Sequence, residues 1–371
     1  MFNVTTTADQ ADAGACGPGD AGCSLREAIV AANTAPSDDT VVVPAGNYVL
    51  TRTGSGENNG LVGDLDVKPN GKLTIVGAGA RTTVIDANQI DRVIDVLDDS
   101  VMDVSGVTIT GGFAPGQFGG GVSVSGGGSS TLTTVTVTDA AVVGNEADQG
   151  GGLENDRSAD LTLTRTTVSG NKADKTGGGI QNVPVVGTAT LHVTNSTISD
   201  NTQSSPTDPS SFEYGGGGIT NVGAVFLDHV TMTGNKAAAI GGGIQQNSGT
   251  VTVKNSIVSS NSASSAGTAN CDSPVASNGF NLEQGATCGF TQATDVSGDP
   301  KLGSLANNGG PTQTNALGSG SAALDVADPI GCPAIDQRGI TRPQGAGCEI
   351  GALERELTDL SLTLADSPDP V

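Results

Sequence analysis

Carboxylate side chains crowd into one short stretch of the sequence, where they could hold a metal ion. Six aspartates lie between residues 86 and 103. Calcium binds several carboxylate and carbonyl oxygens at once, so a site needs such oxygens to converge from neighbouring parts of the chain. We take Asp95, Asp99 and Asp103 as candidate ligands and calcium as the candidate cofactor. The alternative is that these are loop and corner carboxylates of an acidic protein.

Three further side chains, Asp139, Arg165 and His229, could take part in acid–base chemistry. They occupy the fifth position of three similar segments, and Asn195 and Asn255 occupy it in two more. If the segments stack, the five side chains form an outward row, about 4.8 Å apart from coil to coil. Such a row could line a groove in which paired carboxylates act on a polysaccharide. The alternative is a row of exposed residues that keep the surface soluble.

The five segments share one pattern of apolar residues. The first, third and eighth positions are apolar in every segment, and the eleventh is asparagine. Apolar residues that alternate with period two predict a strand with one buried face. The segments are VTVTDAAVVGN (135–145), LTLTRTTVSGN (161–171), LHVTNSTISDN (191–201), VFLDHVTMTGN (225–235) and VTVKNSIVSSN (251–261).

Asparagine and glycine mark two corners in each repeat. Stacked asparagines can hydrogen bond amide to amide, and asparagine tolerates the left-handed backbone of a sharp corner. The glycine runs that follow permit a second bend where the chain packs too tightly for a Cβ. Such a repeat predicts an all-β fold, a right-handed, single-stranded parallel β-helix. The asparagines are Asn145, Asn171, Asn201, Asn235 and Asn261.

Composition narrows the classes of partner. The net charge is −23, with only 16 lysines and arginines, which argues against nucleic acids and anionic membrane surfaces as partners. No apolar run approaches the roughly 18 residues of a membrane span.

The six cysteines fall into three close pairs outside the repeats. We expect disulfide bonds within the pairs, and therefore an extracellular or cell-surface location. The first ten residues lack the features of a signal peptide, so we expect the export signal to lie outside this sequence. The pairs are Cys16 and Cys23, Cys271 and Cys288, and Cys332 and Cys348.

The N-terminal region contains a helix signal. Residues 24–27, SLRE, form a capping box, and Leu25, Ala28, Ile29 and Ala32 then share one face. A short helix here would cover the open end of the β-helix. The stretch CSLREAIVAAN (23–33) resembles the signature of the CSLREA domain, found at the start of β-helical bacterial surface proteins. We therefore expect an N-terminal cap in residues 1–40.

Other stretches resemble parts of similar proteins. VVVPAGNYVL (41–50) and GVTITGG (106–112) resemble the first coils of the right-handed β-helix superfamily, which includes pectate-lyase-like enzymes. The paired GGGI and asparagine signals resemble repeats of chlamydial-type polymorphic outer membrane proteins, although the phenylalanine before their asparagine is missing here.

The end of the chain resembles two further modules. DQRGITRP (336–343) and CEIGALE (348–354) resemble the choice-of-anchor Q domain, and TDLSLTLADSPDPV (358–371) resembles the opening strand of an Ig-like repeat. These likenesses imply β-helix coils in residues 41–265, the last coils and their cap in residues 266–357, and a truncated Ig-like repeat in residues 358–371.

We expect a non-catalytic role, as the stalk or adhesin segment of a larger exported bacterial surface protein. Extracellular or host glycans are the expected partners. The alternative is a polysaccharide lyase or glycoside hydrolase with a groove over residues 130–260; lyases of the resembled superfamily use carboxylates to hold calcium and an arginine or lysine as base. A glycan-binding module without turnover is the third hypothesis.

Overall fold

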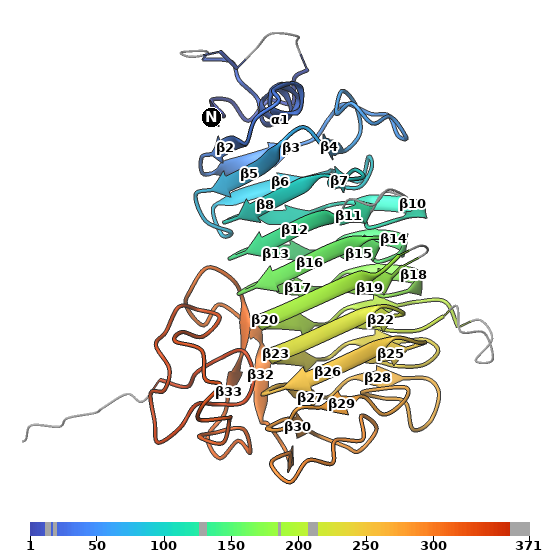
Figure 1. The fold of residues 1–371 in the computed structure, drawn as a ribbon, viewed down its shortest axis with the longest axis vertical. Coiled ribbons are helices and arrows are strands. Elements are labelled where there is room, and N and C mark those ends of the chain that lie inside the picture. The colour runs from blue at the N-terminus through green and yellow to red at the C-terminus, as the bar shows by residue number, and fades with distance from the viewer. Residues whose placement is uncertain (12–15, 18–20, 126–131, 185–186, 207–213, 357–371) are drawn as a thin grey trace, which may run out of the picture.

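Short parallel strands stack in coils along one axis, and helix α1 (Leu25–Thr34) lies over one end (Figure 1). The computed structural model describes all residues except 12–15, 18–20, 126–131, 185–186, 207–213 and 357–371. The predicted all-β parallel β-helix with a short N-terminal helix is confirmed. The predicted Ig-like strand at 358–371 lies outside the described residues.

Sheet A contains two neighbouring columns of strands, which β20 and β23 join into single long strands. The first column is β1 (Phe2–Asn3), β2 (Asp39–Val43), β5 (Lys72–Gly77), β8 (Val101–Ser105), β12 (Thr133–Thr138), β16 (Ala159–Thr164), β20 (Ala189–Ser199), β23 (Ala224–Thr233), β26 (Thr250–Lys254) and β29 (Ala276–Ser277). The second adds β3 (Gly46–Val49), β6 (Thr83–Asp86), β9 (Thr108–Thr110), β13 (Ala141–Val143), β17 (Thr167–Ser169), β27 (Ile257–Ser259), β30 (Leu282–Glu283) and β31 (Val296–Ser297).

Two smaller sheets complete the coils, and from β10 to β25 a strand of sheet C comes first in each coil and a strand of sheet B follows it. Sheet C contains β10 (Phe113–Phe118), β14 (Glu146–Gln149), β18 (Lys172–Thr176), β21 (Thr202–Gln203), β24 (Lys236–Ala237) and β28 (Ser262–Ala263). Sheet B contains β4 (Leu65–Val67), β7 (Ile94–Val96), β11 (Val122–Ser125), β15 (Leu153–Asp156), β19 (Ile180–Val183), β22 (Ile219–Asn221) and β25 (Ile244–Gln246).

The apolar positions of the five segments fill the interior as predicted. Their first, third and eighth residues are all buried, from Val135, Val137 and Val142 in the first segment to Val251, Val253 and Val258 in the last. Successive coils pair in register, so each such residue stacks on its counterpart. The core is therefore a set of aliphatic columns, which suits a chain with 2% aromatic residues.

The five segment-ending asparagines form a continuous hydrogen-bonded ladder. The Nδ2 of each donates to the Oδ1 of the next at 2.9–3.0 Å, and its backbone N–H donates to the same oxygen at 3.0–3.1 Å. Asn270 extends the ladder beyond Asn261. A second, unpredicted ladder runs through sheet B, where Asn155 donates to Asn182 and Asn182 to Asn221 at 2.7 and 2.8 Å.

The left-handed backbone at this corner belongs to the residue before each asparagine, so the expectation that asparagine adopts it is wrong. Those residues have φ between +55° and +70°. The asparagine side chain is turned into the ladder, and the chain must therefore bend one position earlier. The residues concerned are Gly144, Gly170, Asp200, Gly234 and Ser260.

Helix α1 closes the N-terminal end of the solenoid. The predicted capping box is present, because Ser24 Oγ accepts from Glu27 N and Glu27 Oε2 accepts from Ser24 N at 2.8 Å. The predicted apolar face, from Leu25 to Ala32, is buried. The helix covers the interior that the first coil would otherwise expose.

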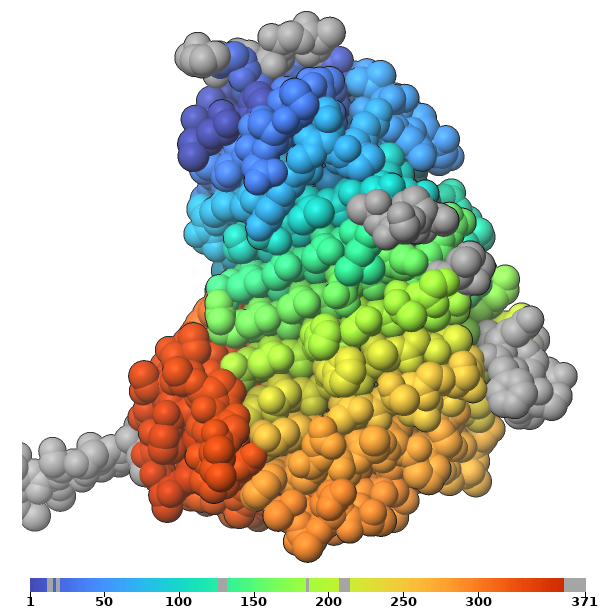
Figure 2. Space-filling view, in the orientation of Figure 1, coloured from blue at the N-terminus to red at the C-terminus, as the bar shows by residue number. Residues whose placement is uncertain are grey.

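The C-terminal segment, residues 299–354, packs along the side of the coils (Figures 1 and 2). It contains an antiparallel pair, β32 (Leu302–Ala306) and β33 (Thr314–Leu317). The buried side chain of Gln337 holds it in place, since Nε2 donates to Thr167 Oγ1 at 2.9 Å and Oε1 accepts from Thr197 Oγ1 at 2.6 Å.

The three predicted disulfide bonds are present, between Cys16 and Cys23, Cys271 and Cys288, and Cys332 and Cys348. They fasten the N-terminal cap, the last coils and the C-terminal segment. Over the described residues, no helix is long and apolar enough to cross a membrane.

We predict that Asn201→Ala lowers the free energy of unfolding by about 2–4 kcal/mol, because the buried backbone N–H of Asn171 loses its acceptor and Asn235 Oδ1 and Val168 O each lose the amide donor of Asn201. Urea unfolding measures the loss. Asn278→Ala is the control, since Asn278 is exposed, and it should change stability little. Equal effects of the two substitutions would contradict a stabilising ladder.

Candidate functional site: a carboxylate cluster on sheet B

The middle residues of the sheet B strands form a polar file on the outer face of the sheet. Their flanking residues, such as Leu65 and Val67 in β4, are buried in the core. Because side chains alternate along a strand, the middle residue points outward. In register the file runs Asp66, Asp95, Ser123, Glu154, Gln181, Thr220 and Gln245.

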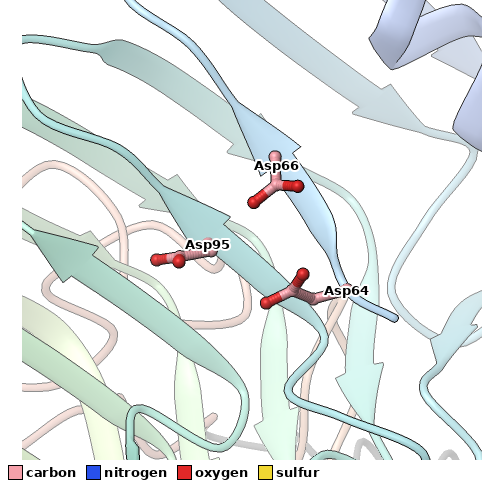
Figure 3. Close-up of side chains that lie close together, drawn as sticks. All are labelled: Asp64, Asp66 and Asp95. Carbon is pink, nitrogen blue, oxygen red and sulfur yellow. The ribbon is translucent and has the colours of Figure 1, made fainter. Parts of the chain in front are cut away.

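Three carboxylates converge at the N-terminal end of this file (Figure 3). Asp64 and Asp66 come from β4 and the residue before it, and Asp95 comes from β7 in the next coil. Each offers an oxygen within 4.8 Å of the others. Asp91 adds its charge to this carboxylate cluster, and burial raises the pKa of the neighbouring Glu154 well above its ordinary value.

Positive charge in the cluster falls short of the negative charge. Arg92 pairs with Asp64 at 3.1 Å and with Asp95 at 3.3 Å, and its third nitrogen donates to Gln117. Burial, and then the charges of Asp66 and Asp91, raise the pKa of Asp64 to about 8. Burial also raises the pKa of Asp66 to about 7. The cluster therefore favours either protons or a cation.

Two carboxylate oxygens in the cluster have no hydrogen-bond partner in the described parts of the chain. Asp66 Oδ2 accepts from Gly60 N at 2.6 Å, but Asp66 Oδ1 and Asp95 Oδ1 are buried and unpaired. Leaving a buried carboxylate oxygen unpaired is costly. Hard divalent cations bind carboxylate oxygens, and calcium accepts an irregular set of them. Asp64, Asp66 and Asp95 therefore fit a calcium ion.

Helix α1 positions the strand that carries two of these ligands. The buried guanidinium of Arg26 donates to the carbonyl oxygens of Gly60, Gly63 and Asp64 at 2.8–3.0 Å. Asn33 binds the backbone of the same strand, with Nδ2 donating to Asp66 O at 2.7 Å. The N-terminal cap is thus also the support of the cluster.

Only one of the three candidate metal ligands lies in the cluster. Asp95 does, whereas Asp99 follows β7 in a turn with φ +63°, and Asp103 lies on β8 of sheet A and pairs with Lys72. A signal for Asp66, one of the two missed ligands, was present. The tripeptides Leu-Asp-Val (65–67) and Ile-Asp-Val (94–96) share one pattern.

The catalytic candidates lie elsewhere, on the corner between the two columns of sheet A. Asp139 and Arg165 form a bidentate ion pair at 2.7 Å. His229 is 0% exposed, and its Nδ1 lies 2.8 Å from Asp228 Oδ1. Burial lowers the pKa of His229, which favours the neutral ring.

The expected exposed row of fifth-position side chains is wrong over three of the five coils. Asn195, His229 and Asn255 are buried. The C-terminal segment covers them, since Asn195 donates to Ile335 O at 3.0 Å and Asn255 accepts from Asp328 N at 2.9 Å. The C-terminal segment therefore lies over this corner, where the sequence had indicated an open groove.

No family model matches the chain, and no curated protein does. Among solved structures, a pectate lyase, Pel9A, is similar with a TM-score of 0.43 and 15% identity, over 95% of this chain and 96% of that one.

The carboxylate cluster predicts a calcium-dependent response of stability to pH. Ordinary aspartates have a pKa of 3.8, so with Asp64 at about 8 and Asp66 at about 7 the folded state keeps protons that the unfolded state has released. This stabilisation is complete below the unfolded pKa and is lost as the pH rises towards about 8. Without calcium, stability should therefore fall across this range, and calcium should restore it at high pH.

Melting temperatures in calcium and in a chelator, measured between about pH 4 and pH 9, test this. Asp66→Asn should reduce both the fall with pH and the response to calcium. Asp103→Asn should behave like the unchanged protein. A melting temperature that is indifferent to calcium at pH 8 would contradict the site.

Proposed function

We propose that this protein is an extracellular β-helix that binds calcium at Asp64, Asp66 and Asp95 and, through the ion, an acidic polysaccharide. The observation that carries the proposal is the pair of buried, unpaired oxygens, Asp66 Oδ1 and Asp95 Oδ1, inside a cluster short of positive charge. The disulfide bonds support an extracellular location. A surface stalk or adhesin segment that holds glycan would use the site in this way.

Most of the polar file is buried, since Asp66, Ser123, Glu154, Gln181, Thr220 and Gln245 are at most 5% exposed, so the file itself is not an open surface for a polysaccharide. Further down sheet B a cavity of about 350 Å³ is lined by Gln149, Lys175, Thr176, Gln181 and Thr220, among others. Gln181 and Thr220 belong to the same file as Asp66 and Asp95. A polysaccharide that enters this cavity would therefore lie on the same sheet as the proposed ion.

A calcium ion would offset the electrostatic repulsion between this protein and an acidic polysaccharide. A protein with a net charge of −23 repels a polyanion. A divalent ion in the cluster reverses the sign of the field locally and can accept a ligand carboxylate as a further oxygen. Acidic sugars are therefore favoured over neutral ones at this site.

The basic residues near the file are engaged in ion pairs, which favours binding of a polysaccharide over its cleavage. A lyase needs a basic group that can take a proton. Arg92 is held by Asp64, Asp95 and Gln117, and Lys175 Nζ lies 2.9 Å from Asp148 Oδ2. Both are engaged in pairs that would have to break, so we favour a glycan-binding module over the lyase alternative.

We predict that polygalacturonate binds in calcium and is released by a chelator. The double substitution Asp66→Asn and Asp95→Asn should weaken binding at least about tenfold, because it removes two charged ligands of the ion. Asp103→Asn, which removes one carboxylate from sheet A, should not. Affinity electrophoresis or calorimetry measures the change.

The same samples decide between binding and cleavage. The proposal expects intact polymer after long incubation with calcium. Unsaturated oligosaccharide products that depend on Asp66 would favour the lyase. Binding that survives both the chelator and the double substitution would contradict a role for the cluster.

A further inference from the structure

A second polar cavity, of about 640 Å³, lies between the coils and the C-terminal segment. One wall is a row of corner residues from four successive coils, namely Asp200, Gly234, Ser260 and Gln284. The facing wall comes from the stretch that leads into β32 and from the β32–β33 pair. This volume is in the range of small-molecule sites, and the cavity lies at a different corner of the coil from the carboxylate cluster.

Buried polar atoms beside this cavity lack partners. Ser199, Thr233 and Ser259 stand in register directly before the corner row and present three hydroxyls, one per coil. Within the described residues, Ser199 Oγ, Ser259 Oγ and the Oδ1 of cavity-lining Asn315 have no hydrogen-bond partner, although all three residues are buried. Buried hydroxyl and amide groups are almost always paired, so this wall is incomplete by itself.

In the corner row, the carboxylate of Asp200 projects over the glycine of the next coil. A Cβ on Gly234 would lie 2.5 Å from Asp200 Oδ1, so the carboxylate of Asp200 occupies the space over this glycine. The facing wall adds Asp299 and Lys301. The lining therefore offers more acceptors than donors, carries one net negative charge, and contains no aromatic ring among its residues.

We propose that this cavity binds a short neutral saccharide. Sugar hydroxyls would donate to Asp200 and to Asn315 Oδ1, both of which line the cavity. An anionic sugar is disfavoured by the two aspartates and by the charge of the chain, and Lys301 opposes a polyamine. This site needs no calcium and is separate from the proposed function of the carboxylate cluster.

The test is titration of the full chain with neutral trisaccharides (cellotriose, xylotriose, maltotriose and mannotriose), followed by calorimetry and saturation-transfer NMR. Asp200→Gly removes the carboxylate at a position with φ +57°, where other coils carry Gly170 and Gly234, so the fold should tolerate it. Ser304→Trp fills the cavity from an exposed position on β32. Asn88→Gly is the matched control, an exposed residue of the first coils with φ +53°.

We expect at least one trisaccharide to bind, with the affinity unchanged by a chelator, by Asn88→Gly and by the double substitution of Asp66 and Asp95. Asp200→Gly should weaken binding about tenfold, the usual effect of losing a hydrogen bond to a charged group, and Ser304→Trp should abolish it. No binding of any of the four up to about 10 mM would overturn the proposal. Equal binding by Asp200→Gly, Ser304→Trp and the unchanged protein would overturn it as well.

Discussion

Register between successive coils is the constraint on which this structure depends. Each residue lies next to its counterpart in the coils before and after, at the spacing of paired strands, about 4.8 Å. Whatever one position does is therefore repeated along the stack. Stacking is favourable for asparagine, because its amide can donate a hydrogen bond to one neighbour and accept one from the other. The ladder from Asn145 to Asn261 is the result. Stacking is also favourable for aliphatic side chains, because together they exclude water from the interior.

The same register is unfavourable for carboxylates, which makes the cluster informative. Two charged carboxylates about 4.8 Å apart repel each other by roughly 3 kcal/mol at an effective dielectric constant near 20. Asp66 is stacked on Asp95, Asp64 lies beside them, and Asp66 Oδ1 and Asp95 Oδ1 are unpaired. This arrangement destabilises the folded state, and the fold itself does not require it. Serine, glutamine and threonine occupy later positions of the same file without such a cost, and burial raises the pKa of Glu154, which lies between Ser123 and Gln181. The proposed cation would account for the unpaired acidic residues at this end of the file.

The sequence allowed the coils to be predicted, because their signals are local and repeated. Alternating valine and leucine, a fixed asparagine and a glycine run each have a direct structural cause. Only one of the three cluster residues was predicted, since Asp95 stands in a visibly acidic stretch while Asp64 and Asp66 lie about one coil earlier. Local sequence patterns could not predict the position of residues 299–354, because it depends on contacts between residues far apart in the sequence. Gln337, for example, contacts Thr167 and Thr197, which are 140 or more residues away. The burial of His229 followed from that same long-range contact.

The cap and the site also form one unit, which the sequence did not reveal. A helix that closes a β-helix needs only an apolar face, yet α1 buries Arg26 and uses it to hold three carbonyls beside the cluster. Asn33 fixes the strand that carries Asp66. The N-terminal helix therefore both ends the solenoid and orients the oxygens proposed to bind calcium.

Locating the ion in a crystal grown with calcium or a lanthanide would test the account most directly. We predict an anomalous peak within about 2.3–2.6 Å of Asp66 Oδ1 and Asp95 Oδ1. Crystals that hold ions only elsewhere on this acidic surface, with these two oxygens still unpaired, would contradict the assignment.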